Sequence, residues 1–161
     1  MVKVLIKKLS PSVQLPSYKT SGASGMDLMA FIKSPITIKP KTSCLITTGI
    51  LMAFSEDYEI QIRPRSGLAA KNNISVLNTP GTIDSDYRGE IKVIIYNHGD
   101  RDFVINNNDR IAQMILAPVI KIELQEIDEL PETMRGEGGF GSTGKWVIYL
   151  IKKKLRDFQD K

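Results

Sequence analysis

The stretch EIKVIIYNHGDRDFVINNNDRIAQMIL, residues 90–116, decides the fold class of this chain. Three short segments rich in Val and Ile follow one another, and turn-forming Asn, Asp and Gly residues separate them at short intervals. Such spacing is typical of β-strands joined by tight connections. The stretch therefore predicts several short strands of an all-β domain.

The same pattern of short apolar segments separated by turn-forming residues extends over most of the chain. Ile60 and Ile62 alternate with Glu59 and Gln61, as in a strand with one buried face. Helical propensity is confined to SGLAAKN, residues 66–72. Many short strands with one helical turn predict a sandwich, a barrel or a jelly roll. The predicted strands are 2–8, 36–38, 44–53, 59–63, 74–77, 90–96, 103–105 and 110–124.

Length and composition favour one soluble domain. The 161 residues fit a single core, and no apolar run approaches the ~18 residues of a membrane helix. The first residues do not resemble a secretory signal, so we expect a cytoplasmic protein. A lone Cys44 excludes an internal disulfide and a multi-Cys zinc site. The lone His98 lies in a turn-like stretch, and any Ser-His or Cys-His catalytic arrangement would depend on it.

The net charge of +4 comes from the C-terminal tail. Residues 145–161 carry six basic and two acidic side chains, which leaves residues 1–144 neutral. We therefore do not expect the body of the protein to bind nucleic acid, since such binding needs clustered Lys and Arg.

A glycine-rich segment, RGEGGFGSTG at 135–144, can wrap phosphate oxygens with backbone N–H groups and hydroxyls. It contains a formal G-x-G-x-x-G, but no strand leads into it and no βαβ unit surrounds it, so a dinucleotide site is not indicated. We expect a flexible arm that contributes to an active site, and a plain linker is the alternative.

Two further segments suggest anion chemistry. RPRSGLA at 63–69 places two arginines before the helical turn, which predicts phosphate binding or, alternatively, a solvated loop. NTPGTIDSDYRGE at 78–90 predicts a β-hairpin that carries Asp84 and Asp86, although Asp-Ser-Asp is also ordinary turn chemistry.

Five segments together resemble the motifs of the homotrimeric dUTPase family, in order and spacing. Each is weak alone, but five in order are specific, and they span most of residues 1–144. The motifs are ASGMDLMA at 23–30, RPRSGLA at 63–69, GTIDSDYRGE at 81–90, NDRIAQ at 108–113 and RGEGGFGSTG at 135–144.

The resemblance implies a fold and an activity. The fold would be a jelly-roll-like β-barrel core over residues 1–134, followed by an active-site arm at 135–144 and a basic extension at 145–161. A homotrimer would hold three sites at subunit interfaces, each built from all three chains. The reaction would be hydrolysis of dUTP to dUMP and pyrophosphate, with Mg2+, by in-line attack of a water activated by Asp84 on the α-phosphorus.

The resemblance also implies residue roles. Tyr87 would stack under the deoxyribose and exclude UTP, and Asp27 would reach Mg2+ only through water. The hairpin would read uracil through Asn78, Gly81 and Ile83. The phosphates would be bound by Arg65, Ser66, Gly67 and Gln113. The arm would place Arg135 on the γ-phosphate, Phe140 over the uracil, and Ser142, Thr143 and Gly144 around the phosphates. Gly141 of the arm would also bind the substrate.

Alternatives remain at this point. A dCTP deaminase, or a bifunctional deaminase with dUTPase activity, shares the fold, and a non-enzymatic regulatory protein could use the same scaffold. Val147, Ile151, Leu155 and Phe158 form one stripe of an amphipathic helix in the tail. That tail could pack on the trimer, be a disordered extension, or contact a membrane surface or nucleic acid.

Overall fold

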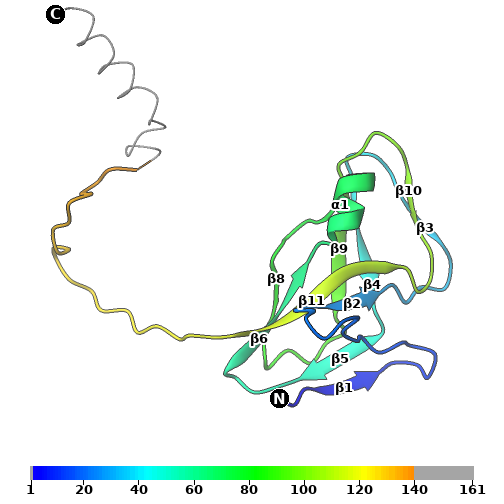
Figure 1. Cartoon of the computed structure of the whole chain (residues 1–161), viewed down its shortest axis with the longest axis horizontal. Helices are drawn as coiled ribbons and strands as arrows, with labels where there is room; N and C mark the ends of the chain where they lie inside the picture. Colours follow the sequence, from blue (N-terminus) through cyan, green and yellow to red (C-terminus); the bar gives the residue numbers. More distant parts are fainter. Residues whose placement is uncertain (1, 140–161) are drawn as a thin grey trace, which may run out of the picture. The chain divides into compact units, whose positions relative to one another are not determined.

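The computed structural model describes residues 2–139 (Figure 1). The chain divides into two units, Met1–Lys121 and Ile122–Lys161. The first unit carries the regular structure. Its elements are β1 (Leu5–Lys8), β2 (Met26–Met29), β3 (Ile36–Ile38), β4 (Ser43–Thr47), β5 (Ile50–Ala53), β6 (Tyr58–Arg63), α1 (Ser66–Asn72), β7 (Ile74–Val76), β8 (Gly81–Ile83), β9 (Lys92–Asn97), β10 (Phe103–Ile105) and β11 (Arg110–Pro118).

The strands pair antiparallel throughout the described residues. A four-stranded sheet has the order β2-β11-β6-β8, and a three-stranded sheet has the order β4-β9-β7. The pairs β1-β5 and β3-β10 complete the arrangement. Most neighbours in these sheets are distant in sequence, so the fold is held by long-range pairing. The all-β prediction is confirmed.

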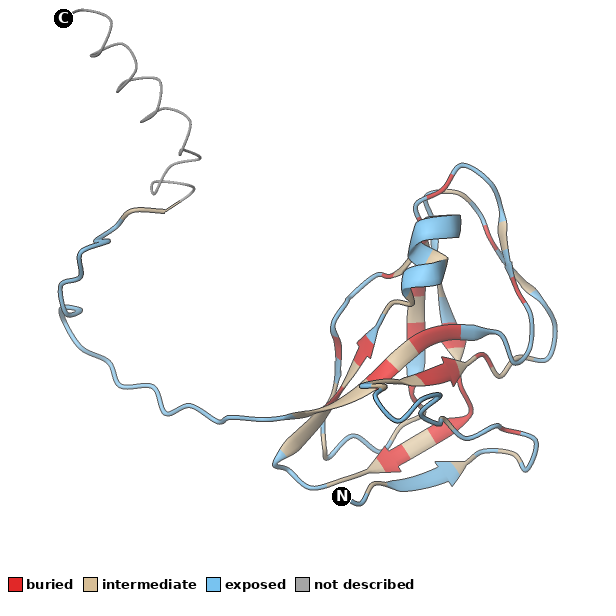
Figure 2. Cartoon of the chain, in the orientation of Figure 1, coloured by how far each residue is buried: buried red, intermediate tan, exposed pale blue. Residues whose placement is uncertain are grey.

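Isoleucine dominates the core. Ile46, Ile60 and Ile91 are fully buried, and most of the buried positions lie on the strands (Figure 2). In β9 the buried Val93 and Ile95 alternate with outward-facing neighbours, as the period of a strand requires. β-Branched side chains pack well on such half-buried pleated surfaces. The pattern that predicted strands therefore also builds the core.

The predicted strand at 44–53 is two strands, β4 and β5, divided at Thr48 and Gly49. Gly49 has φ +70°, and a Cβ there would lie 2.5 Å from Cγ2 of Val13. The Thr48 hydroxyl donates to the carbonyl of Ile91 at 2.6 Å. Glycine permits this left-handed turn, and the turn sends β4 to β9 and β5 to β1.

The last strand ends at Pro118, and the prediction that it reached residue 124 is wrong. Pro118 pairs with Tyr58, which is the first residue of β6, so the neighbouring strand ends there. A final backbone bond runs from Val119 N–H to the carbonyl of Asp57 at 2.8 Å. The short strands β2 and β8 were not predicted, since both lie in segments rich in turn-forming Gly, Ser, Asp or Pro residues.

Helix α1 has the bounds that the sequence predicted. Asn73 follows it in the left-handed conformation, φ 56°, and its N–H donates to the carbonyl of Ala69 at 3.1 Å. This is a common way to end a helix. Within residues 2–139 we find no helix that is both long and apolar enough to traverse a bilayer.

Candidate active site

The segment between β7 and β9 carries the third motif. β7 and β9 pair antiparallel, with Val76 opposite Ile95, so the ends of the segment are held together as the predicted hairpin requires. Its interior differs from a simple hairpin because β8 leaves this sheet and pairs with β6 in the other one. The segment therefore joins the two sheets and is anchored on both.

Asp84 directly follows β8 and begins a turn in which Tyr87 N–H donates to its carbonyl at 3.2 Å. Its side chain is exposed. Within residues 2–139 the Asp84 carboxylate has no hydrogen bond or ion pair to another side chain. A carboxylate that keeps its lone pairs free and faces solvent is chemically able to accept a proton from water.

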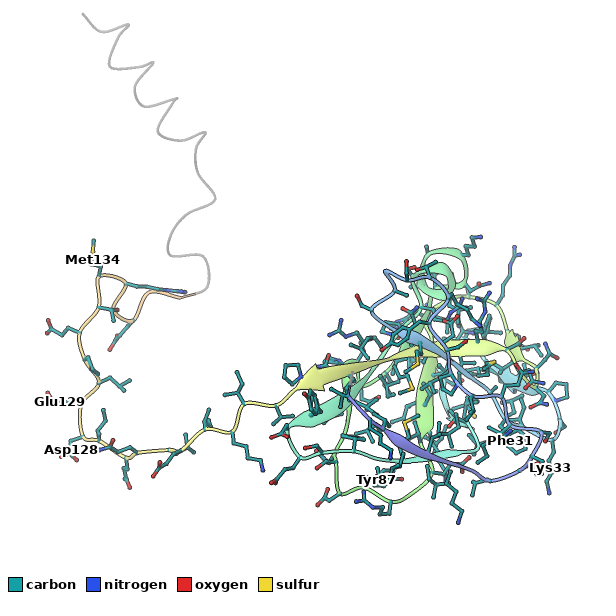
Figure 3. The ribbon with its side chains drawn as sticks, turned by 60° about the horizontal axis from the view of Figure 1, so that its bottom comes forward. Phe31, Lys33, Tyr87, Asp128, Glu129 and Met134 are labelled. Carbon is teal, nitrogen blue, oxygen red and sulfur yellow. The ribbon has the colours of Figure 1, made fainter. Side chains whose placement is uncertain are left out.

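Tyr87 lies folded back along the same loop, at the edge of the β-domain (Figure 3). Its hydroxyl donates to the carbonyl of Glu90 at 3.1 Å, and the ring is 45% exposed. The carboxylate of Glu90 accepts the N–H of Gly49 at 2.8 Å, which ties the loop to the turn between β4 and β5. Tyr87 is thus held by a hydrogen bond within its own loop. Glu90 helps to hold it in place, a role that the sequence did not single out.

The start of this segment is compact. The Asn78 side chain lies against Gly81, where a Cβ would be 3.0 Å from the Asn78 amide nitrogen. Gly81 is buried and pairs with Ile62, and the half-buried Ile83 pairs with Ile60. The predicted base-reading residues therefore lie together beside Asp84.

A second group of side chains gathers around Asp27 of β2, which is only 5% exposed. Arg65 Nε donates to Asp27 Oδ1 at 3.0 Å, and Arg110 Nη1 donates to Oδ2 at 3.2 Å. Arg65 Nη1 also donates to the carbonyl of Arg110 at 3.1 Å. Gln113 faces Asp27 in the register of β11 with β2. The first, second and fourth motifs thus form one cluster, with Ser66 and Gly67 exposed at the adjacent start of α1.

Arg110 was missed as a site residue, although its motif had been noted. A register shift between Arg110 and Ala112 interrupts the pairing of β11 with β2. Such irregularities re-aim side chains, so strand alternation does not show which way this arginine points. A pocket of about 320 Å³ lies beside it, and its lining includes Arg65, Arg110 and Asp109.

The two groups lie far apart within one chain. Asp84 follows Ile83, which pairs with Ile60 near the start of β6, whereas Arg65 lies two residues beyond the end of β6 at Arg63. From the residue opposite Asp84 to Arg65 the backbone advances about six residues, four of them within β6 and two in the extended stretch beyond it. At roughly 3.3 Å per extended residue this spans a backbone distance of about 20 Å. Figure 3 likewise places Tyr87 at the end of the domain opposite helix α1.

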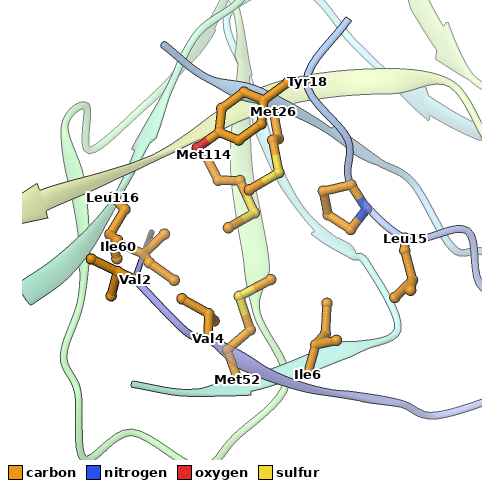
Figure 4. Close-up of a pocket in the computed structure, with 11 residues that line it drawn as sticks. Val2, Val4, Ile6, Leu15, Tyr18, Met26, Met52, Ile60, Met114 and Leu116 are labelled. Carbon is orange, nitrogen blue, oxygen red and sulfur yellow. The ribbon is translucent and has the colours of Figure 1, made fainter. Parts of the chain in front are cut away.

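An apolar pocket of about 290 Å³ lies under the N-terminal segment (Figure 4). Met52, Ile60 and Met114 form part of its wall, and Val4, Leu15 and Tyr18 close it from the N-terminal side. Its walls offer a phosphate no charged side chain among the described residues.

Other predicted residues are described only in part. In the second unit, Arg135 Nε donates to the carbonyl of Gly138 at 2.6 Å, and Gly136 has φ +51° within that turn. Phe140, Gly141, Ser142, Thr143 and the tail at 145–161 lie outside the described residues. The division at 134 and 144 stays a prediction.

His98 directly follows β9, and its Nε2 lies 2.8 Å from the hydroxyl of Ser75. Among residues 2–139 no carboxylate is hydrogen-bonded to its ring, so the pair lacks the third member of a triad. Among the same residues, no three His, Cys, Asp or Glu side chains are grouped to hold a metal ion.

Comparison with known proteins gives one answer. Residues 12–144 match the family model of dUTPase. A deoxyuridine 5'-triphosphate nucleotidohydrolase of Hydrogenobaculum sp. is 53% identical over 143 residues, which cover 89% of this chain and 99% of the relative. The protein of the same name from Treponema denticola is 54% identical over 137 residues, covering 85% and 95%.

Solved structures show the same fold. A variant of the Staphylococcus bacteriophage 80alpha dUTPase with dUpNHpp has a TM-score of 0.79 at 23% identity, and the match covers 88% of this chain and 98% of that one. A dUTPase variant of phage phi11 of S. aureus, which coordinates a structural Mg(II) ion, has a TM-score of 0.72 at 20% identity, covering 81% and 99%. The jelly-roll-like fold is therefore confirmed, and the chain belongs to the dUTPase family of hydrolases, as its five motifs predicted.

Proposed function

We propose that this dUTPase hydrolyses dUTP to dUMP and pyrophosphate by in-line attack of water on the α-phosphorus, with Asp84 as the general base. The free, exposed carboxylate of Asp84 supports this role, because a base must have a lone pair available for the water proton. Its place directly after β8 fixes the backbone from which it reaches the substrate.

The hairpin residues beside Asp84 would bind the nucleoside. Gly81 and Ile83 have their backbone fixed by pairing with β6, which suits recognition of uracil through main-chain groups. The Asn78 side chain lies against Gly81. A site whose polar groups match uracil would reject cytosine, since the mismatch leaves buried groups unpaired. Tyr87 would stack under the deoxyribose and exclude the 2'-hydroxyl of UTP.

The cluster around Asp27 would bind the triphosphate. Arg65, Gln113 and the exposed start of α1, Ser66 and Gly67, provide charge and hydrogen-bond donors for phosphate oxygens. Asp27 neutralises part of the charge of Arg65 and Arg110 and fixes their positions. The arm would complete the site with Arg135 on the γ-phosphate, and with Phe140, Gly141, Ser142 and Thr143 over the nucleotide.

Mg2+ fits this cluster only as an ion held mainly by substrate phosphates and water. Asp27 is the one carboxylate at its centre, and each of its oxygens accepts one arginine bond and keeps capacity for a water. Mg2+ commonly binds in this way, with one or two carboxylates besides phosphates. When bound, the ion would neutralise phosphate charge.

The active sites would be shared between the subunits of a homotrimer. The observation that carries this proposal is the separation of about 20 Å between Asp84 and Arg65 along β6, which exceeds the span of a triphosphate. We therefore infer that Asp84 of one copy and Arg65 of another act on one substrate.

The segment after β11 also favours a partner copy. Ile120, Ile122 and Leu124 are 87%, 77% and 86% exposed, and they alternate as in a strand with one apolar face. Burying such a face against a second copy would remove it from water. The cytoplasmic location and the absence of nucleic-acid binding stay predictions from the sequence.

The test is pyrophosphate release from dUTP, UTP, dCTP and dTTP, with and without Mg2+. We expect release from dUTP with Mg2+, and a loss of about 100-fold or more in kcat for Asp84→Asn with retained binding of a non-hydrolysable analogue. Near-normal turnover of Asp84→Asn would contradict the assignment of the base. Ammonia release from dCTP would instead indicate a deaminase.

A further inference from the structure

Tyr87 rests directly on Gly89, and this contact leaves no space for a side chain at position 89. A Cβ built there would lie 2.2 Å from the Tyr87 hydroxyl oxygen, 2.4 Å from Cζ and 2.9 Å from Cε2. Carbon atoms in favourable contact are about 3.5–4.0 Å apart. The ring can therefore occupy its observed position only because residue 89 is glycine.

We infer that Gly89 and Glu90 form a seat for the Tyr87 ring, called here the Tyr87 seat, and that this seat determines the selectivity for deoxyribose over ribose. The inference rests on the proposed function, in which Tyr87 excludes the 2'-hydroxyl. It adds Gly89 and Glu90 as positioning residues, which act through the Tyr87 ring. Exclusion of the 2'-hydroxyl depends on the position in which the Tyr87 ring is held, and not only on the presence of the ring.

The seat is fixed to the interior of the domain. The Tyr87 hydroxyl donates to the carbonyl of Glu90 at 3.1 Å, and the Glu90 carboxylate accepts the N–H of the buried Gly49 at 2.8 Å. The next residue, Ile91, is fully buried, and its N–H donates to the carbonyl of Ile50 at 2.8 Å. The exposed ring is thus connected to the core through two residues, which holds it in place before a nucleotide arrives.

Substitution of Gly89 by alanine isolates the position of the ring. Gly89 does not have a positive φ, so alanine brings no backbone strain. All three crowded atoms belong to the half-exposed side chain of Tyr87, which can rotate away. The ring must move by about 1 Å to regain normal contact distances. A displacement of that size can cost about 100-fold where geometry is critical.

The experiment compares kcat/KM for dUTP and for UTP in the full-length protein. For Gly89→Ala we expect the ratio of the two to fall about tenfold or more, with unchanged oligomer mass and a thermal midpoint close to that of the wild type. The matched control is Gly22→Ala, where an added Cβ has no atom within 4 Å and the ratio should not change.

A double-mutant cycle separates the seat from a general structural effect. In a Tyr87→Ala background there is no ring to displace, so adding Gly89→Ala should change the ratio by less than about twofold. A tenfold further fall in that background would overturn the inference, as would a Gly89→Ala protein that does not fold or that keeps the wild-type ratio.

The cycle also distinguishes the inference from the function on which it rests. If Tyr87→Ala keeps the wild-type ratio, the proposed role of Tyr87 fails, and the seat fails with it. If Tyr87→Ala lowers the ratio while Gly89→Ala does not, the role of Tyr87 stands and only the seat is refuted.

Discussion

Complementation between two inactive variants tests the sharing of active sites between chains. Asp84→Asn removes the proposed base, and Arg65→Ala removes a proposed phosphate ligand about 20 Å away along β6 in the same chain. Each variant alone should be nearly inactive. If Asp84 and Arg65 of one site come from different chains, a mixed trimer contains complete sites.

The expected recovery follows from the symmetry of a cyclic trimer. A trimer with two chains of one variant and one of the other has three interfaces. At each interface one chain supplies the hairpin and its neighbour supplies Arg65 or its replacement, and this ordered combination is different at all three. Only one pair joins a hairpin with Asp84 to a neighbour with Arg65. Either mixed composition should therefore show about one third of the wild-type activity per trimer.

The assay is pyrophosphate release by mixed trimers, purified through two different tags after co-expression. The control pairs Asp84→Asn with the double variant Asp84→Asn/Arg65→Ala, in which no site can be complete. Activity that stays at the level of this control, in trimers confirmed by mass, would refute the shared site.

Two further changes test the supports of the site. Asp27→Ala leaves Arg65 and Arg110 without their carboxylate acceptor, so we expect the KM for dUTP to rise about tenfold. The unfolding free energy should fall by only about 1–2 kcal/mol, because both arginines are partly exposed. An unchanged KM would contradict a role of the cluster in binding the triphosphate. Gly49→Ala places a Cβ 2.5 Å from Val13 at a residue with φ +70°. We expect urea unfolding to show that the unfolding free energy falls by at least about 2 kcal/mol, whereas a fall below about 0.5 kcal/mol would show that the turn adapts.

The candidate site could be predicted from the sequence wherever its residues lie in a contiguous motif. The segment 81–90 predicted Asp84 and Tyr87 as site residues, and the structure places both on one loop. Glu90 was part of the same motif but had no assigned role. Its partner, the N–H of Gly49, lies 41 residues away, and local sequence does not contain that contact.

The cluster at Asp27 likewise depends on contacts that the local sequence does not contain. Asp27 and Arg110 are 83 residues apart and meet only because β2 pairs with β11. The resemblance to the dUTPase family implied that Asp27 reaches a metal ion only through water, and this stays a prediction. The structure adds that two arginines donate to the Asp27 oxygens. The order in which the strands pair brings Asp27 and the two arginines together, and that order depends on the packing of the whole core.

By itself, the sequence determined the all-β class, the bounds of α1 and the family, because alternation, helix propensity and motif order are local properties of the chain. Only the tertiary structure decided that β8 joins β6, that Asp27 bridges two arginines, and that Tyr87 rests on Gly89. Each of these is a contact in space, and its energy comes from packing and hydrogen bonds between elements that the local sequence does not specify.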